Sequence, residues 1–476
     1  VMYGFAKREK NLTVLLNTSV EKVETENGKI TSVTGWNLVE YCRYQVEGKL
    51  FADCSGDSIL RLSGAKYRRG REARDEFDEP HAPEKADAKT MGNTILIQLR
   101  RTDRHIPFRA PEWAYHYTEE TLPKRNFNPE GNNFWWMEFG GLTDTVGDAD
   151  AIRDELYKIA YGCWEYIKNH PDGRGRGWEL DWIGSLPGKR ENVRYVGDHI
   201  LCQKEVEAGG NFADAVTYGG WTMDDHHPEA IYYPGAPTIF HPAPSPFGIP
   251  YRSLYSANVE NLFFAGRNIS TTHMAMSSTR VMATTSTLGQ AIGTAAALAA
   301  KYGETPRGIY ERHIDELQQT LLDQDQFIPN IPRRVSPLSQ KGTLDAAILG
   351  NGRDRDWDDG QQGAEFAPGE GAAYRFASPE TVSGVRLVFD SNLADLKRQL
   401  NVEDHTMYRP MPAQLPKRFR IEAKVNGKKR VLAEVAENRH RLVKLDWEPV
   451  KCSEVRLVLE EGWSDRPMRV FSYEVR

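Results

Sequence analysis

Residues 261–303 read NLFFAGRNISTTHMAMSSTRVMATTSTLGQAIGTAAALAAKYG. The apolar run 262–265 predicts a short buried strand that ends at Gly266. A polar loop follows, and a helix rich in small residues is predicted to begin near Thr287, capped by neighbouring hydroxyl groups, and to end before Gly303. This order indicates a strand-to-helix crossover in an α/β domain.

The start of the predicted helix has two features that suit a ligand. An unpaired helix start presents backbone N–H groups and a partial positive charge, which favour an anion or a polarised carbonyl. Gly289 and Gly293, one helical turn apart, let another backbone or a flat ligand approach closely. From the pattern alone, an ordinary crossover and a ligand-binding one are equally open.

Several motifs in this stretch resemble the closing motif of a family of FAD-dependent oxidoreductases, whose FAD domain is similar to that of glutathione reductase. They are 265–270 (AGRNIS), 278–282 (STRVM) and 288–293 (LGQAIG), together with His273. In that family the glycine after the strand meets the ribityl-pyrophosphate side of the flavin, and the helix start faces the flavin pyrimidine. The resemblance implies that FAD is bound by Gly266, Arg267, Asn268, Gly289 and Gln290.

The amino-terminal residues are predicted to form strands of the same fold. Strands are expected over 13–16, 19–23, 29–33 and 44–46, and Asn27-Gly28 is a hairpin signal between the second and third of them.

The run 50–57 (LFADCSGD) resembles the family's strand followed by Asp-Ala-Thr-Gly-Asp, with Cys54 and Ser55 in place of the usual Ala and Thr. The resemblance implies that the Val20 backbone touches the adenine. It also implies a second FAD-contacting turn made of Ser55, Gly56 and Asp57.

One motif that normally opens a dinucleotide-binding fold does not occur in the sequence. No Gly-x-Gly-x-x-Gly run is found between residues 1 and 476. The resemblance spans about 13–328 and corresponds to the family's later portion, so the first βαβ unit and the native N-terminus are expected to be missing. A chain without that unit is expected to bind FAD poorly or not at all.

Length and composition limit the class of protein. The chain has 476 residues, of which 39% are hydrophobic and 27% charged, with a net charge of -6. This length predicts two or three domains, no run approaches the ~18 apolar residues of a membrane helix, and the acidic balance argues against nucleic-acid binding. The five cysteines are widely spaced, so neither a disulfide framework nor a zinc ribbon is supported. The sequence leaves open the oligomeric state and the compartment, a periplasmic or secreted location included.

Residues 65–250 are predicted to form an α+β substrate domain inserted into the flavin fold, with an amphipathic helix over 151–167. The runs 188–199 and 218–228 (YGGWTMDDHHP) resemble the family's Arg-Glu helix start and its Gly-Gly-Trp followed by Asp and His. On this resemblance, Arg190 and Trp221 are expected to contact substrate.

The run Asp224-Asp225-His226-His227 has three interpretations. A zinc site could use Asp224, His226 and His227, but adjacent histidines rarely turn to one metal. A solvated polar loop is the second interpretation. The favoured one places His226 or Asp224 near the flavin as proton acceptor, because removing hydride from an alcohol or amine carbon needs a base for the heteroatom's proton.

Two further groups are expected to close the pocket. Tyr251 and Arg252 lie in a loop that resembles the one before the family's last FAD strand, and they are expected to point toward substrate or flavin. His273 is a second candidate base, and Arg280 would stabilise the anionic reduced flavin or a substrate carboxylate. Ion pairing without a catalytic role is the alternative for both.

The sequence changes character after a predicted helix over 310–322 and a Pro-rich break at 328–332. Apolar residues then recur at every second position, which predicts an all-β sandwich. The runs 383–389 and 468–471 resemble a discoidin-type jelly roll, a module that often binds carbohydrate. Its candidate binding residues are Trp357, Trp447 and Trp463, and a scaffolding or dimer role is the alternative.

The sequence therefore predicts an FAD-dependent oxidoreductase with an appended β-sandwich. Hydride would pass from a small hydroxylated or sugar-like substrate to flavin, with His226, His273 or Asp224 as base and no metal. The alternatives are a non-catalytic carbohydrate-binding protein and a flavin-dependent, non-redox enzyme acting on a polysaccharide. The predicted segments are a partial, Rossmann-like FAD-binding domain (1–64), a substrate domain (65–250), the closing FAD strand and helix (251–328), a linker (329–342) and a jelly-roll sandwich (343–476).

Overall fold

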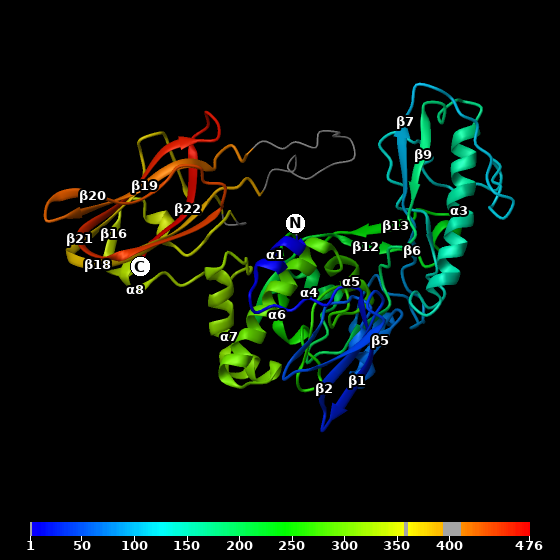
Figure 1. The fold of residues 1–476 in the computed structure, drawn as a ribbon, viewed down its shortest axis with the longest axis horizontal. Helices are drawn as coiled ribbons and strands as arrows, with labels where there is room; N and C mark the ends of the chain where they lie inside the picture. The colour runs from blue at the N-terminus through cyan, green and yellow to red at the C-terminus, as the bar shows by residue number, and fades with distance from the viewer. Residues whose placement is uncertain (1, 357–359, 394–410) are drawn as a thin grey trace. The chain divides into compact units, whose positions relative to one another are not determined.

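The computed structural model describes residues 2–356, 360–393 and 411–476. The chain forms two compact units, residues 1–318 and 319–476 (Figure 1). Each unit contains a core of buried hydrophobic side chains.

A two-stranded parallel sheet joins distant parts of the first unit. β4 (Phe51–Asp53) pairs in parallel with β15 (Leu262–Phe264), and all three residues of β15 are buried. This confirms the strand predicted from the apolar run. Because both strands run in the same direction, the turns that follow them, at Gly56 and Gly266, meet at one edge of the sheet.

A three-stranded antiparallel sheet consists of β1 (Thr18–Glu26), β2 (Lys29–Asn37) and β3 (Cys42–Glu47). The hairpin turn between the first two strands is confirmed, since Asn27-Gly28 has φ of 50° and 77°. The strand predicted over 13–16 is wrong. In the described part of the chain no strand pairs with these residues, so their apolar side chains have no sheet to join.

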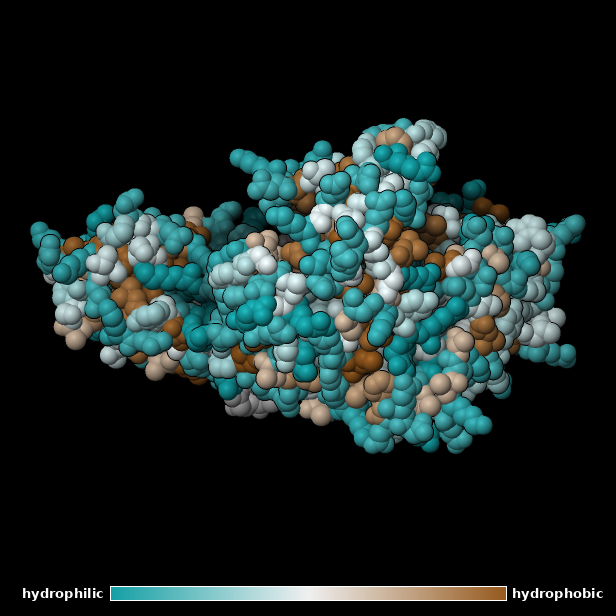
Figure 2. Space-filling view, turned by 90° about the horizontal axis from the view of Figure 1, so that it is seen from below, coloured by the Kyte–Doolittle hydropathy of each residue, from teal (hydrophilic) through white to brown (hydrophobic). Residues whose placement is uncertain are grey.

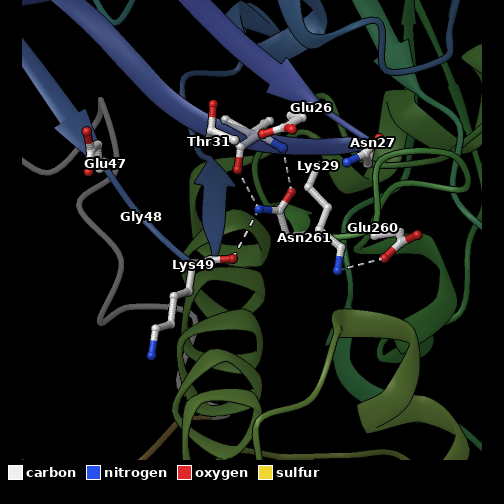
Figure 3. A pocket seen from close by; sticks show the side chains of 10 residues that line it. Glu26, Asn27, Lys29, Thr31, Glu47, Gly48, Lys49, Glu260 and Asn261 are labelled. Atoms are coloured by element: carbon white, nitrogen blue, oxygen red, sulfur yellow. Dashed lines mark hydrogen bonds and ion pairs between the residues drawn. The ribbon is translucent and has the colours of Figure 1, made fainter.

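The Asn261 side chain links this antiparallel sheet to the parallel pair of strands by hydrogen bonds (Figure 3). Its Oδ1 accepts the backbone N–H of Ile30 at 2.9 Å, and its Nδ2 donates to the carbonyls of Ile30 at 2.8 Å and Lys49 at 3.0 Å. Asn261 also lines a surface pocket of about 960 Å³. The charged side chains of that pocket are Glu26, Lys29, Glu47, Lys49 and Glu260.

A short helix, α5 (His273–Thr279), lies where a polar loop was predicted. Thr272 caps it, since its Oγ1 accepts the backbone N–H of Ala275 at 3.2 Å. All seven residues of α5 are buried, which places polar side chains in the interior of the unit.

The long helix α6 (Met282–Tyr302) begins earlier than the predicted start at Thr287. The predicted hydroxyl caps are also wrong, because the N-cap is Val281 and the hydroxyls of 285–287 donate to carbonyls of the preceding turn. Serine and threonine inside helices commonly bond in this way. The predicted end is confirmed at Gly303, which has φ of 70°.

The helix predicted over 151–167 is confirmed as α3 (Ala149–Asn169), with its apolar side in a core shared with Trp136 and Phe134. The helix predicted over 310–322 lies within α7 (Pro306–Asp323). The other elements before α7 are α1 (Met2–Arg8), η1 (Ile59–Ser63), β5 (Tyr67–Arg69), α2 (Arg74–Phe77), β6 (Asn93–Thr94), β7 (Ile97–Arg101), β8 (Glu138–Phe139), β9 (Trp178–Ile183), β10 (Val193–Tyr195), α4 (Gln203–Glu207), β11 (Ala215–Gly219), β12 (Met223–His226), η2 (Ala230–Tyr232), β13 (Thr238–His241), β14 (Phe247–Pro250) and η3 (Tyr251–Ser253).

The second unit is built on β-strands, as the period of two predicted. Its strands pair in the order β17-β22-β18-β21-β19-β20, with β16 on β18, and the long β18 and β21 change partners along their length.

Two of the three tryptophans predicted as binding residues of this unit make hydrogen bonds within it. The indole N–H groups of Trp447 and Trp463 donate to backbone carbonyls at 3.1 and 2.7 Å, and Trp357 lies outside the described residues. The elements are α8 (Pro337–Lys341), β16 (Gly342–Leu344), η4 (Ala347–Gly350), β17 (Ala364–Phe366), β18 (Ala373–Phe389), β19 (Pro416–Val425), β20 (Lys428–Val435), β21 (Leu442–Gly462) and β22 (Met468–Val475).

The surface is mostly hydrophilic on the face shown in Figure 2, where hydrophobic residues come in small groups. Among the described helices, none combines the length and the apolar composition needed to cross a lipid bilayer.

Candidate active site

Asp57 and Arg267 form an ion pair between the two strand-end turns. Lys189 contributes a second cation, with its Nζ 2.5 Å from Oδ2 of Asp57. Gly56 has φ of +70°, and a Cβ there would lie 2.5 Å from Nη1 of Arg267. The Arg267 side chain therefore crosses directly over Gly56, at a position that favours glycine on both counts.

The backbone after β15 turns at Gly266, where φ is +123°. Oδ1 of Asn268 would lie 3.0 Å from a Cβ at Gly266. Asn268 is fully buried, and within the described part of the chain neither polar atom of its amide has a hydrogen-bond partner. The predicted residues that the structure brings together at these turns are Ser55, Gly56, Asp57, Gly266, Arg267 and Asn268.

Buried polar atoms without partners are concentrated on residues 267–280. Each such atom costs about 1–3 kcal/mol unless a ligand or water satisfies it. The pyrophosphate, ribityl hydroxyls and ring carbonyls of FAD offer matching acceptors and donors, so this segment fits the cofactor. Among the described residues the atoms are Arg267 Nε, Asn268 Oδ1 and Nδ2, Ser270 Oγ, Thr271 Oγ1, Thr279 Oγ1 and Arg280 Nε.

Three predicted cofactor residues lie apart from this cluster. Val20 is half-buried on β1 opposite Gly35. Gly289 and Gln290 lie within α6, where Gln290 is exposed and a Cβ on Gly289 would meet nothing within 4 Å. The helix face at Gly289 is therefore open, and contacts of these three residues with FAD stay predictions.

A second cluster surrounds His226 on β12. Oε1 of Glu138 lies 2.7 Å from Nδ1 of the His226 ring, and Oδ1 of Asp224 lies 3.3 Å from Nε2. Glu138 and His226 are both buried. The Trp135 ring meets the His226 ring edge-on at 5.3 Å. The neighbouring His227 takes no part, because its ring stacks on Tyr233 at 3.5 Å.

Two arginines hold the carboxylates of this cluster. Nη2 of Arg190 lies 2.7 Å from Oε1 of Glu138, and Nη2 of Arg280 lies 3.3 Å from Oδ2 of Asp224. Burial lowers the pKa of both guanidinium groups, and the charge of Arg190 also lowers that of Arg280. The cluster thus contains nearly balanced charge in a buried setting, in which each ionic contact is strengthened.

Asp224 is ionised at neutral pH. Burial acts to raise the pKa of its carboxyl, but the hydrogen bond and charge of His226, with Thr238 and Arg280, outweigh burial and lower that pKa to about 2. A carboxylate with so low a pKa is a weak proton acceptor. Asp224 is therefore poorly suited to act as the base, and His226 is the other predicted candidate in this run.

His273 lies between two carboxylates at the start of α5. Its Nδ1 is 3.0 Å from Oε2 of Glu191, and its Nε2 is 3.0 Å from Oδ1 of Asp225. Burial acts to lower the pKa of the ring, but the two carboxylates outweigh it and raise that pKa to about 10. His273 is consequently an imidazolium at neutral pH, which suits stabilisation of negative charge better than removal of a proton.

A buried ion network fixes the position of Glu191. Arg194, which is 1% exposed, pairs with Glu191 and also with Glu72, whose Oε1 lies 2.8 Å from Nη2 of Arg194. The other oxygen of Glu72 accepts the backbone N–H of His273 at 2.8 Å. The network therefore holds both the side chain and the backbone of His273.

The helix α5 packs against the strand that carries the His226 cluster. His273 at its start contacts Asp225, and Arg280 just beyond its end contacts Asp224, so α5 packs along β12. Because α5 follows the turn at Gly266 in the chain, it connects that turn to the His226 cluster.

The predicted substrate residues have different positions. Arg190 lies in the His226 cluster, and Trp221 is 47% exposed, with its carbonyl accepting the hydroxyl of Ser278 at 2.6 Å. Tyr251 is buried and donates to the carbonyl of Pro306 at 2.9 Å. Arg252 forms a bidentate pair with Asp214 at 2.9 and 3.0 Å. The structure does not bring Tyr251 and Arg252 to the cluster, and their contact with substrate stays a prediction.

Sequence reasoning missed three carboxylates that orient the two histidines. Glu191 and Asp225 lie next to residues that were singled out, so the runs Arg190-Glu191 and Asp224-Asp225 held a signal for them. Glu138 lies in a run of aromatic residues with no such signal. In the residues that the structure describes, no group of three or more His, Cys, Asp or Glu side chains is placed to hold a metal ion.

The family model described as "FAD dependent oxidoreductase" matches residues 1–321. The chain belongs to this family of FAD-dependent oxidoreductases. Its cofactor is FAD, in agreement with the partnerless polar atoms on 267–280.

Solved structures similar to parts of the chain include carbohydrate-binding proteins. Chitosan-binding module 1 from a chitosanase/glucanase of Paenibacillus sp. IK-5 is 11% identical, with 29% of this chain and 97% of that chain covered and a TM-score of 0.22. The family 32 module of C. perfringens NanJ, solved with galactose, is 12% identical over 29% of this chain and 94% of that chain, with a TM-score of 0.21. TM-scores this low do not support the transfer of a ligand or an activity from these proteins to this chain. No curated protein matches the chain in sequence.

Proposed function

We propose that this family member oxidises a small hydroxylated or sugar-like substrate. When bound, FAD supplies an acceptor for the two electrons that leave a substrate carbon as hydride. The proton of the substrate hydroxyl must then pass to a protein base. The observation that supports this reaction best is the His226 ring, held by Glu138 at 2.7 Å in a cluster that also contains Arg280.

His226 is the proposed base. Glu138 accepts the Nδ1–H of the ring, which leaves Nε2 as the nitrogen that takes the proton. Asp224 lies farther away, at 3.3 Å from Nε2, and its ionised carboxylate stabilises the imidazolium that forms. The positive charge of His273 stabilises negative charge that develops on the substrate oxygen or the reduced ring.

The test uses anaerobic reduction of the flavin-loaded protein by a panel of pyranoses and aldonic acids. Reduction is followed by loss of absorbance at about 450 nm. We expect His226→Gln to slow reduction by about 10²-fold or more, and His227→Gln, the neighbouring control, to leave it unchanged. Equal rates in the two variants would exclude His226 as the base, and no reduction by any member of the panel would exclude the substrate class.

A pocket in the second unit favours a second function for that unit, namely binding of carbohydrate. This pocket of about 220 Å³ includes Asp390, Gln414 and the ring of Phe471. The guanidinium groups of Arg441 and Arg469 lie 5.2 and 4.7 Å from the Phe471 ring centre. These guanidinium groups cover the buried Phe471 ring, and the carboxylate of Asp390 and the amide of Gln414 suit the hydroxyl groups of a sugar.

Affinity electrophoresis on gels that contain soluble polysaccharides tests this second function. Arg469→Ala is expected to abolish retardation, and Arg439→Ala, which changes an arginine outside the pocket, is expected to retain it. Retardation that survives Arg469→Ala, or none for the wild type, would contradict it.

A further inference from the structure

The hairpin of β12 and β13 carries an exposed aromatic residue, Phe240, opposite Asp224 of the His226 cluster. Asp224 pairs with Phe240 across the two strands, and His226 pairs with Thr238. Residues directly opposite in an antiparallel pair share a face, and so do residues two apart on one strand. Asp224, His226, Thr238 and Phe240 therefore lie on the same face of the hairpin.

Phe240 is 57% exposed although its neighbours on that face are buried or half-buried. Ile239, the next residue, is exposed to a similar degree, 52%, but lies on the opposite face with Asp225. A large exposed side chain of this kind contributes little to the core. Phe240 lies opposite Asp224, which belongs to the His226 cluster, whereas Ile239 lies opposite Asp225, which contacts His273.

A second ring lies at the other end of the same face. Trp135 meets His226 edge-on at 5.3 Å, whereas Phe240 lies opposite Asp224. The hydroxyl of Thr238 donates to Asp224, and that carboxylate has lone pairs left for further donors. This face of the hairpin therefore carries the Asp224 carboxylate, which accepts a hydroxyl group, the proposed base His226, and the aromatic ring of Phe240.

We propose that Phe240 is a substrate-binding residue that stacks on the C–H face of a pyranose ring. Asp224 accepts a hydroxyl of the same ring, and His226 takes the proton of the hydroxyl that is oxidised. This inference rests on the proposed function and names a sugar ring as the substrate class. Recognition combines apolar contact on one side of the ring with hydrogen bonds at its edge.

The test measures saturation transfer by NMR from the protein to methyl β-D-glucopyranoside and methyl β-D-galactopyranoside. All variants carry Arg469→Ala, which removes the candidate sugar site of the second unit. We expect Phe240→Ala to weaken binding of the better pyranoside about tenfold and Phe240→Tyr to restore it. Ile239→Ala, the matched control on the other face, should bind like the parent protein.

Three results would overturn the inference: no binding of either pyranoside by the parent, equal losses in Phe240→Ala and Ile239→Ala, or a Phe240→Ala variant that loses FAD while it keeps the sugar. Loss of FAD in the Phe240→Ala variant would place the Phe240 ring against the cofactor. If binding depends on Phe240 but no pyranoside reduces the flavin, the role of Phe240 in sugar binding stands, whereas the proposed oxidation and the role of His226 as its base fail.

Discussion

Glu138 and His226 are 88 residues apart in the sequence and form a buried pair with Oε1 2.7 Å from Nδ1. Arg190 contacts the same carboxylate oxygen at 2.7 Å, so Glu138 is held from two sides. Such a carboxylate fixes both the orientation and the tautomer of a histidine ring. The pair joins β8 to β12 and provides the core of the proposed proton-handling site.

Glu138→Gln is expected to slow flavin reduction by about 10²-fold or more, because the amide nitrogen can donate to Nδ1 and stabilise the wrong tautomer. Stopped-flow reduction across pH 5–9 measures both the rate and any shift in its pH profile. Asp150→Asn, which changes a carboxylate on α3 whose side chain is 91% exposed, is the control. An unchanged rate and pH profile would remove Glu138 from the mechanism.

The sequence located the two strand-end turns, at Gly56 and Gly266, because their signals are local. A short apolar run ending in Gly266 and the run Ser55-Gly56-Asp57 predict turns at strand ends, and β4 pairs with β15 as such a fold requires. The helix start was misplaced because the hydroxyls of 284–287 resemble caps, whereas Thr272 caps a separate helix. Glu138 could not be found from sequence, since its role depends on contacts between residues 52 and 88 positions away.

Gly266 and Gly289 are both predicted cofactor residues, but they are expected to respond differently to substitution by alanine. Gly266→Ala places a side chain at φ +123° beside Asn268 and is expected to cost about 1–3 kcal/mol of stability and to weaken FAD binding. Gly289→Ala meets nothing within 4 Å inside a helix and should stabilise the protein by about 0.5–1 kcal/mol. Thermal unfolding and FAD titration measure both effects. Weaker FAD binding in Gly289→Ala would show that the cofactor approaches α6 there.

His273 predicts how stability depends on pH. Folding raises the pKa of His273 from 6.5 to about 10. The charged ring therefore stabilises the folded protein fully below about pH 6.5, and this contribution is lost as the pH rises toward 10. The slope is at most about 1.4 kcal/mol per pH unit. Urea unfolding of wild type and His273→Gln from pH 6 to 10 should give curves that converge as pH rises. A constant difference between the curves would show that His273 is not charged in the folded protein.

Asn261 is expected to be important for stability, since its amide makes three hydrogen bonds that join the two sheets. Asn261→Ala leaves the backbone N–H and C=O of the buried residue Ile30 without the amide, whereas the carbonyl of the exposed residue Lys49 can bind water, so the substitution should cost about 1–3 kcal/mol. Asn258→Ala should cost less, because the Asn258 amide, which bonds the backbone of Lys66 and Gly64, is at an exposed position where water can replace it. Urea midpoints that are equal for the two variants would show that water replaces the Asn261 amide.

The most direct test of FAD binding at residues 267–280 is a paired measurement on Asn268→Leu. The wild-type side chain is fully buried, and among the described residues its amide has no partner. Leucine removes that unsatisfied group, so the cofactor-free protein should unfold at the same or a higher temperature, while the Kd for FAD rises about tenfold or more. Unfolding at a lower temperature together with an unchanged Kd for FAD would contradict the placement of the cofactor against this segment.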